Sequence, residues 1–197
     1  MDSKILGKVI DAAFFLQKRN VPNHLDFIES FRSSQIQSKT KLVDEICNFD
    51  MNWNHILVLG SWNSVLLYEL FSEQANVSWF DFLDIDPVCH RHRDAYFGLH
   101  NMRKNYSNLI MDATEFSDFS KYDLIINTSC EHMKDIPAIN GPLYALQSNN
   151  NTSIKEHINC VNSSKALAKQ NNITDIRYHG TIEIADYERY TVIGQYW

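Results

Sequence analysis

Short apolar runs alternate with amphipathic stretches over most of the chain. The first run, residues 56–59, is continuously apolar and ends at Gly60 and Ser61, as expected for a strand that is buried on both faces. Residues 65–71 follow with the apolar spacing of a helix. This part of the chain therefore predicts a strand, a turn and a helix in succession.

The same alternation continues toward the C-terminus. It predicts a strand, a helix, three short strands and a helix, in that order, at residues 77–83, 89–99, 108–111, 122–127, 143–147 and 163–170. Parallel neighbours need crossover connections, which are usually helices. The expected fold class is therefore α/β: a Rossmann-like open, mainly parallel sheet with helices on both faces.

Both ends of the chain depart from this alternation. Residues 176–184 and 190–196 are joined by the polar residues 185–189, which predicts a C-terminal antiparallel hairpin at the sheet edge. Residues 1–50 repeat apolar positions at helical spacing, including Ile10 and Phe14. This helical N-terminal extension either covers the core or closes over a ligand. A chain of 197 residues is expected to form a single domain, with residues 55–197 as its Rossmann-like core.

Composition and charge exclude several classes of protein. With 44% hydrophobic and 21% charged residues the chain is not a disordered one, and no apolar run approaches the roughly 20 residues of a membrane span. Residues 1–8 lack the features of a secretory signal, which favours a cytoplasmic location. The net charge of −6 makes nucleic acid an unlikely partner.

Two groups of residues are expected to be structural. The basic cluster at residues 90–93, followed by Arg103 and Lys104, is expected to be the solvated face of a surface helix, with a phosphate contact as the alternative. The four cysteines are far apart and form no Cys-x-x-Cys pair, which is typical of reduced, buried thiols.

Polar residues follow each predicted strand, where an open α/β sheet binds its ligand. Gly60 ends the first strand, and Asp84 ends the second, 24 positions later. A glycine allows close approach of the backbone, and an acidic side chain at this spacing can accept both ribose hydroxyl groups. Because a dinucleotide site needs further glycines after the first strand, a nucleoside without phosphates fits these residues better than NAD or FAD.

Four short motifs occur in a fixed order along the chain. They are residues 56–61 (ILVLGS), 83–87 (LDIDP), 111–113 (MDA) and 122–133 (YDLIINTSCEHM). With these motifs, residues 55–147 resemble the class I S-adenosylmethionine-dependent methyltransferases. The resemblance implies a Rossmann-like fold and S-adenosylmethionine as the cofactor.

The resemblance also implies roles for individual residues. The cofactor would be bound by Gly60, Ser61, Asp84, Ile85, Asp112, Ala113 and Asn127, with Asp84 at the ribose, Asp112 and Ala113 at the adenine and Asn127 near the sulfonium. Asp84 could instead be a helix N-cap, although Asp86 with Pro87 makes a better one, and Asp112 could be structural.

The first motif departs from the family pattern. Val58 stands where the family usually has an acidic residue, and residues 61–63 (Ser-Trp-Asn) replace further glycines. The methionine part of the cofactor is therefore held in an unusual way, or the reaction is not methyl transfer.

Further polar residues follow the fourth and fifth predicted strands. Glu131 and His132 could take a proton from a methyl acceptor and are the predicted catalytic residues, with a structural role for His132 as the alternative. Gln147, Asn149 and His157 are predicted to bind the substrate, as part of an amide-rich group that could equally cap loops.

No metal is expected from the spacing of histidines along the chain. There is no His-Glu-x-x-His motif, and His90 and His92 would point apart on a helix. The sequence predicts an S-adenosylmethionine-dependent methyltransferase that acts on a small polar molecule. An S-adenosylmethionine-using lyase or aminocarboxypropyl transferase, and a non-catalytic Rossmann-like binding module, are the alternatives. The sequence does not indicate the oligomeric state.

Overall fold

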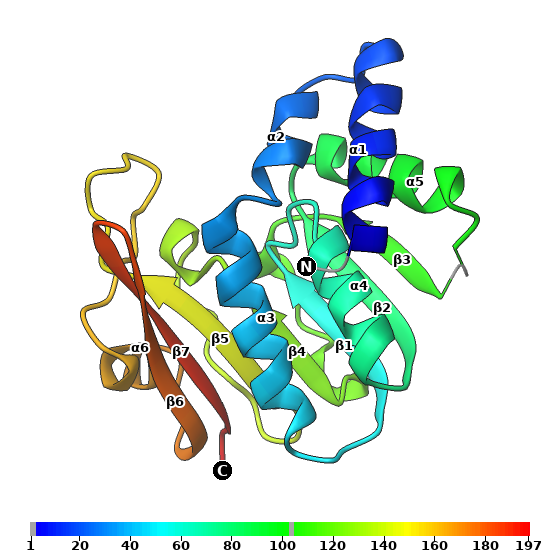
Figure 1. Ribbon diagram of the computed structural model, residues 1–197. Helices are drawn as coiled ribbons and strands as arrows, with labels where there is room; N and C mark the ends of the chain where they lie inside the picture. The colour runs from blue at the N-terminus through cyan, green and yellow to red at the C-terminus, as the bar shows by residue number, and fades with distance from the viewer. Residues whose placement is uncertain (1–2, 103–104) are drawn as a thin grey trace.

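A computed structural model describes residues 3–102 and 105–197 (Figure 1). Its described residues form one seven-stranded sheet with the strand order β3-β2-β1-β4-β5-β7-β6. The strands β1 to β5 pair in parallel, whereas β7 is antiparallel to both β5 and β6. In chain order they are β1 (Trp53–Leu59), β2 (Val77–Asp84), β3 (Tyr106–Ile110), β4 (Leu124–Asn127), β5 (Leu143–Asn149), β6 (Asp175–Ile184) and β7 (Tyr187–Gln195). The mainly parallel sheet and the C-terminal antiparallel hairpin are thus confirmed.

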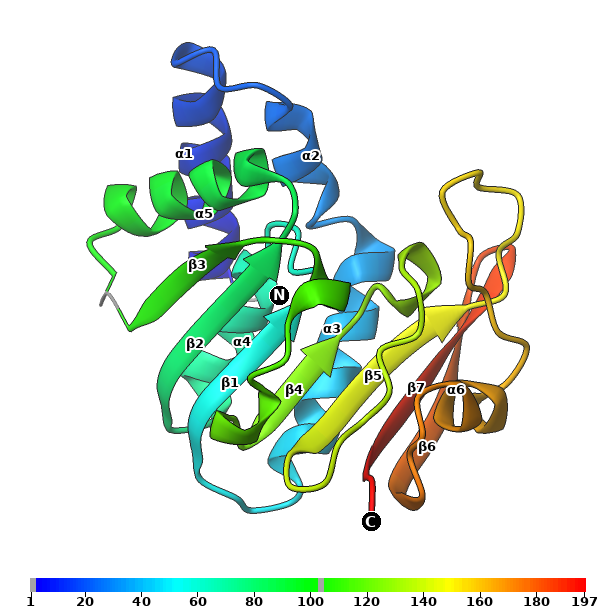
Figure 2. The same ribbon diagram turned by 180° about the vertical axis from the view of Figure 1, so that it is seen from behind.

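Helices lie on both faces of the sheet, as predicted (Figures 1 and 2). Three helices precede the sheet: α1 (Ser3–Lys18), α2 (His24–Glu29) and α3 (Ser33–Cys47). On the same face, α4 (Val65–Gln74) and α5 (Pro87–Leu99) connect β1 to β2 and β2 to β3. On the other face lie α6 (Ser164–Gln170) and the 3-10 turns η1 (Ala113–Glu115), η2 (Phe119–Lys121) and η3 (Cys130–His132). The crossovers on this second face are therefore shorter and mostly not α-helical.

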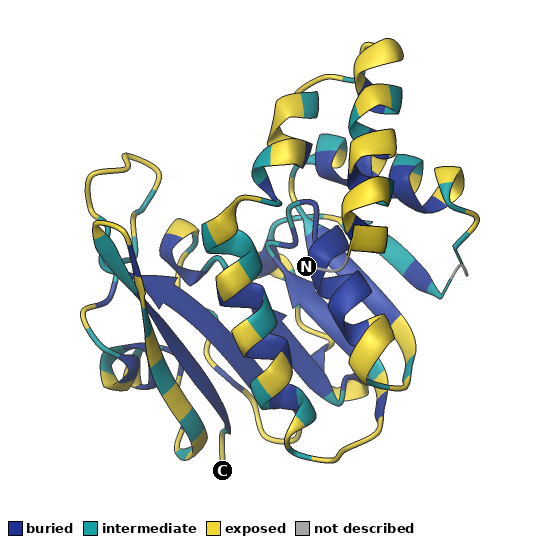
Figure 3. Ribbon diagram, viewed as in Figure 1, coloured by how far each residue is buried: buried dark blue, intermediate teal, exposed yellow. Residues whose placement is uncertain are grey.

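Strand β1 shows how the sequence produces these two layers. Side chains alternate between the faces of a strand, so Ile56 and Val58 pack under the helices α3, α4 and α5, while Leu57 and Leu59 pack on the opposite side. All four side chains are buried. Burial on both faces explains the continuous apolar run, and Figure 3 shows the same burial across the central strands.

The N-terminal extension is helical, but two of the apolar residues in its predicted pattern do not face the core. In α1 the buried residues are Ile5, Val9, Ala12 and Leu16. Ile10 and Phe14, which belong to the predicted pattern, are 47% and 67% exposed. They lie on the outer side of the helix, because the apolar positions of α1 cover a wider arc than its contact with the rest of the protein.

The turn of the C-terminal hairpin is shorter than predicted. Only Ala185 and Asp186 separate β6 from β7, and Ala185 has a left-handed backbone conformation with φ of 46°. The predicted turn over residues 185–189 is therefore wrong for residues 187–189, which belong to a strand. Tyr187 and Arg189 belong to β7, and Arg189 pairs with Asn149 of β5.

The structure also bears on the cysteines and on membrane-spanning helices. Cys89 and Cys130 are buried, as expected, whereas Cys47 and Cys160 are only partly buried. None of the described helices has the length and apolar character that crossing a membrane requires.

Candidate functional site

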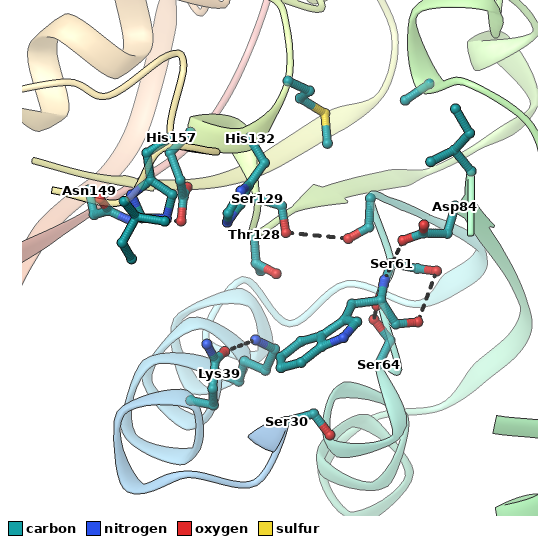
Figure 4. Close-up of a pocket in the computed structure, with 18 of the residues that line it drawn as sticks. Ser30, Lys39, Ser61, Ser64, Asp84, Thr128, Ser129, His132, Asn149 and His157 are labelled. Atoms are coloured by element: carbon teal, nitrogen blue, oxygen red, sulfur yellow. Dashed lines mark hydrogen bonds between the residues drawn. The ribbon is translucent and has the colours of Figure 1, made fainter. Parts of the chain in front are cut away.

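A cavity of about 810 Å³ opens beyond the carboxyl ends of the parallel strands. Figure 4 shows Ser61 and Asp84 at one end of it and His132, Asn149 and His157 at the other. The loops after β1 to β5 all contribute lining residues, and so do α2, α3 and β7. The predicted residues Gly60, Ser61, Asp84, Ile85, Asp112, Ala113, Glu131, His132, Asn149 and His157 all line this cavity.

The loop after β1 forms one wall of the cavity and contains a single glycine, Gly60. Gly60 has φ of 53°, and the non-glycine residues Trp62 and Ser64 also have left-handed conformations, with φ of 43° and 44°. For residues other than glycine such conformations cost roughly 1–3 kcal/mol each and persist only where the surrounding structure imposes them. The loop must therefore be held by other parts of the protein.

Arg93 of α5 provides that support. Its guanidinium group donates to the carbonyl oxygens of Asn63 (3.0 Å) and Trp62 (2.6 Å) and to the hydroxyl oxygen of Ser61 (2.9 Å). It also lies 4.0 Å from the ring centroid of Phe82. Arg93 is fully buried, and this burial lowers its pKa to about 10. The fork of donors thus fixes the backbone of a loop that has only one glycine.

These contacts correct the interpretation of the basic cluster as a solvated face. His90, His92 and Arg93 are buried, and only Arg91 is exposed. His92 interacts with the side chain of Asn63 (3.0 Å) and with the carbonyl oxygen of Pro22 (2.9 Å). The side chains of His92 and Arg93 point from α5 toward the loop after β1 and bond to residues 61–63. Arg103 and Lys104, the other members of the cluster, lie outside the described residues.

The carboxylate of Asp84 is oriented by the backbone. One oxygen accepts a hydrogen bond from the amide of Trp62 (2.6 Å), and the other accepts from the amide of Asp86 (3.0 Å). The N-cap of α5 is Asp86, which accepts from the amide of Val88 (2.8 Å). Asp84 is therefore not needed as the cap, and its neighbour Ile85 is 67% exposed at the cavity wall.

Asp112 and Ala113 line the same end of the cavity. Asp112 caps η1 by accepting hydrogen bonds from the amide (2.8 Å) and the hydroxyl group (2.7 Å) of Thr114. These hydrogen bonds lower the pKa of Asp112 below its usual value. Asp112 thus has the structural role that the sequence left open, and it also lies where it can contact a ligand.

Glu131 is the central acidic group at the opposite end. It is 2% exposed, and one carboxylate oxygen, Oε1, accepts from the amide of Asn149 (2.7 Å) and from Arg189 (3.4 Å). The second oxygen, Oε2, is buried without a hydrogen-bond partner among the described residues. A buried carboxylate oxygen without a partner is costly and points to a ligand.

Two histidines lie beside Glu131. The rings of His132 and His157 meet edge to face, with their centroids 4.5 Å apart. Burial lowers the pKa of His132 below its usual value, and the negative charge of Glu131 opposes this shift. The ligand atoms of Glu131, His132 and His157 all lie within 4.8 Å of one another. The spacing of histidines along the sequence did not reveal this cluster.

Lys39 and Arg189 are cavity residues that the sequence analysis missed. Burial lowers the pKa of Lys39 to about 7, and the nearby charge of Arg189 lowers it further. A signal for Lys39 exists, because it lies one helical turn before the buried residues Leu42 and Val43 of α3. Arg189 was assigned to a turn, so its position on a strand facing the site was not foreseen.

Asn127 and Gln147 are not among the residues that line the cavity, so their contacts with cofactor and substrate stay predictions. Asn127 is 2% exposed and accepts from the amide of Ser129 (2.9 Å), so it shapes the loop that does line the cavity. Gln147 is fully buried and accepts from the hydroxyl group of Ser38 (2.9 Å). Gln147 thereby links β5 to α3.

Comparisons with solved structures identify the fold. N-methyltransferase NodS from Bradyrhizobium japonicum WM9, in complex with S-adenosyl-L-homocysteine, has a TM-score of 0.64 at 11% identity, covering 92% of this chain and 98% of that chain. Magnesium protoporphyrin IX methyltransferase from Synechocystis PCC 6803, with bound S-adenosylmethionine, has a TM-score of 0.61 at 12% identity, with 85% and 82% covered. A putative sarcosine dimethylglycine methyltransferase from Galdieria sulphuraria has a TM-score of 0.57 at 16% identity, with 76% and 66% covered.

Neither the protein-family models nor the curated proteins give a match to this sequence. The strand order and these structural similarities show that the chain has the Rossmann-like fold of class I S-adenosylmethionine-dependent methyltransferases.

Proposed function

We propose that the protein is an S-adenosylmethionine-dependent methyltransferase that acts on a small polar molecule. The observation that carries this proposal is the cavity itself, which extends from Gly60 and Asp84, an end suited to a nucleoside, to the polar groups of Glu131 and Asn149. The similar structures of NodS and of the Synechocystis enzyme contain S-adenosyl-L-homocysteine and S-adenosylmethionine. These ligands support S-adenosylmethionine as the cofactor of this chain.

The cofactor end offers groups suited to a nucleoside. The carboxylate of Asp84 is held by two backbone amides and lines the cavity, and its remaining lone pairs can accept the ribose hydroxyl groups. Ile85 and Ala113 supply apolar surface for the adenine ring. Gly60 and Ser61 let the backbone lie close to the rest of the cofactor.

The opposite end offers groups suited to a methyl acceptor. Methyl transfer requires the acceptor atom to lie in line with the bond between the methyl carbon and the sulfur, so positioning is the main contribution of the protein. The free oxygen of Glu131 and the imidazole of His132 can take the proton that an attacking amine or hydroxyl group loses. Asn149 and His157 can hold further polar atoms of the acceptor.

The size of the cavity supports a small acceptor. A volume of about 810 Å³ lies within the usual range of small-molecule sites, roughly 300–1,000 Å³. Ser30, which directly follows α2, and Lys39 of α3 close the side of the cavity opposite the sheet. The N-terminal helices therefore both cover the core and line the ligand site, which joins the two roles considered for this extension.

Product analysis tests the reaction. The protein is incubated with S-adenosylmethionine and pools of small amines, alcohols and carboxylic acids, and the adenosine-containing products are separated by chromatography. We expect S-adenosylhomocysteine from the wild type and at least 100-fold less, roughly, from Glu131→Gln. Methylthioadenosine would instead indicate a lyase or an aminocarboxypropyl transferase. Tight cofactor binding without any product would favour a binding module.

A further inference from the structure

Glu131, His132 and His157 form a compact group of nitrogen and oxygen ligands. Each side chain offers one ligand atom, and all three atoms lie within 4.8 Å of one another. Glu131 and His132 are neighbours in η3, whereas His157 comes from the loop after β5. Two separate segments thus converge on one point at the acceptor end of the cavity.

The free oxygen of Glu131 indicates that this point takes a ligand. Oε1 is occupied by Asn149 and Arg189, but the buried Oε2 has no hydrogen-bond partner among the described side chains and backbone groups. Leaving a buried carboxylate oxygen unsatisfied costs about 1–3 kcal/mol or more. A cation at this oxygen would remove that cost.

The hydrogen bonds around the cluster are those of metal ligands. Nδ1 of His157 lies 2.7 Å from the carbonyl oxygen of Asn151, to which it donates. The lone pair of the neutral ring is then on Nε2, the nitrogen that remains for a metal. The hydrogen bond from Asn149 to Glu131 orients the carboxylate in a similar way.

We propose that Glu131, His132 and His157 bind a divalent transition-metal ion such as Zn²⁺. Two imidazole ligands favour a transition metal over Mg²⁺ or Ca²⁺, which prefer oxygen ligands alone. Three protein ligands would leave a coordination position of the ion for another ligand, and all three residues line the cavity. An acceptor hydroxyl group or amine bound to the ion would lose its proton more readily, and that proton would pass to water in the cavity. Glu131 and His132 would then be metal ligands, and the base considered above would not be needed.

The geometry requires only a small adjustment. Ligand atoms around tetrahedral Zn²⁺, with bonds of about 2.0–2.2 Å, lie roughly 3.3–3.6 Å apart. Closing the present separation of at most 4.8 Å needs side-chain rotations. The side chain of His132 is partly accessible to solvent and can rotate toward the other two ligands, while the hydrogen bond to Asn151 holds the ring of His157. Arg189 and Asn149 contact Oε1, which leaves the lone pairs of Oε2 for the metal.

Metal titration tests this site directly and without S-adenosylmethionine. Metal-stripped wild type is titrated with Zn²⁺ by calorimetry and with Co²⁺ by visible absorption, which reports the ligand set. We expect one ion per chain. Loss of a group that only orients a metal ligand lowers metal affinity roughly 10- to 100-fold, and His157→Ala, which removes a ligand itself, should lower it by more. Glu131→Gln should weaken it similarly, while His179→Ala, at an exposed histidine outside the cavity, should bind like the wild type.

Circular dichroism and a melting curve confirm that each variant is folded. The proposal is overturned if the wild type does not bind Zn²⁺, if His157→Ala binds it as tightly as the wild type, or if Mg²⁺ binds with equal affinity. Cofactor binding is measured separately by titration with S-adenosylmethionine. Loss of the metal site would therefore leave the proposed methyl transfer to be judged on its own evidence.

Discussion

Gly60 is the residue at which the backbone of β1 turns into the cavity. Its φ of 53° is unfavourable for a residue with a side chain, and an added Cβ would lie 2.5 Å from Cε of Met133. The methionine can move, so the backbone conformation decides the cost. Glycine is therefore required here for conformational reasons as well as for close approach of a ligand.

We expect Gly60→Ala to lower the free energy of unfolding by about 1 kcal/mol or more, because alanine is strained at positive φ. Gly7→Ala is the matched control. Gly7 lies within α1 with no atom near its missing Cβ, and the substitution should raise stability by about 0.5–1 kcal/mol. Chemical denaturation measures both changes. Equal effects of the two substitutions would contradict the conformational argument.

We expect Lys39 to lower the stability of the fold at neutral pH. Its pKa is about 7 in the folded protein and 10.5 in a solvated chain, so the unfolded state binds more protons between these values. The stability of the wild type should therefore rise as the pH increases from about 7 to 10.5. Below the lower value the full penalty for burying the charge is present.

Lys39→Met should accordingly raise the free energy of unfolding by roughly 2–4 kcal/mol at neutral pH and below. The gain should disappear above the ordinary pKa of lysine. Urea denaturation at several pH values measures this difference, with Lys165→Met at an exposed position of α6 as the control. A gain that does not depend on pH would show that the charge of Lys39 is not the cause.

At the scale of elements, α5 and the loop after β1 act as one unit. Arg93 donates to three consecutive residues of that loop, 61–63, and stacks on Phe82 of β2. A lysine ammonium group is a point charge and cannot reproduce this planar set of donors. The loop conformation therefore depends on a helix that comes about 30 residues later.

Arg93→Lys should lower the free energy of unfolding by about 2–4 kcal/mol, since buried carbonyl oxygens lose their donors. It should also weaken S-adenosylmethionine binding at least 10-fold, roughly, because the left-handed residues of the loop are released. Denaturation and calorimetry measure the two effects. Arg91→Lys, at the exposed neighbour, should change neither, and an equal effect at both positions would refute the role of Arg93.

The elements themselves could largely be predicted from the sequence. The run of residues 56–59 identified β1, because a strand that is buried on both faces must be apolar at every position. The hairpin turn was misjudged because Tyr187, Glu188 and Arg189 look like a polar turn, although Glu188 and Arg189 bond to groups of the sheet and its loops. The basic cluster was misjudged for the same reason. In a sequence, a polar residue that is hydrogen-bonded inside the protein cannot be distinguished from one that is exposed to solvent.

At the scale of the whole molecule, the cavity combines residues from all parts of the chain. Those next to strand ends, such as Asp84 and Glu131, could be predicted because the fold fixes where strands end. Lys39 from α3 and Arg189 from β7 reach the cavity through tertiary packing and strand register. No local pattern encodes these contacts, so Lys39 and Arg189 could not be predicted as cavity residues.

The central claim is that this cavity binds S-adenosylmethionine with Asp84 at the ribose. Calorimetric titration of the wild type, Asp84→Ala and the exposed control Asp11→Ala with S-adenosylmethionine tests it most directly. We predict that the wild type and Asp11→Ala bind with equal affinity, and that Asp84→Ala loses roughly 1–3 kcal/mol, or about 5- to 150-fold in affinity. Absence of binding by the wild type, or equal binding by Asp84→Ala, would contradict the account.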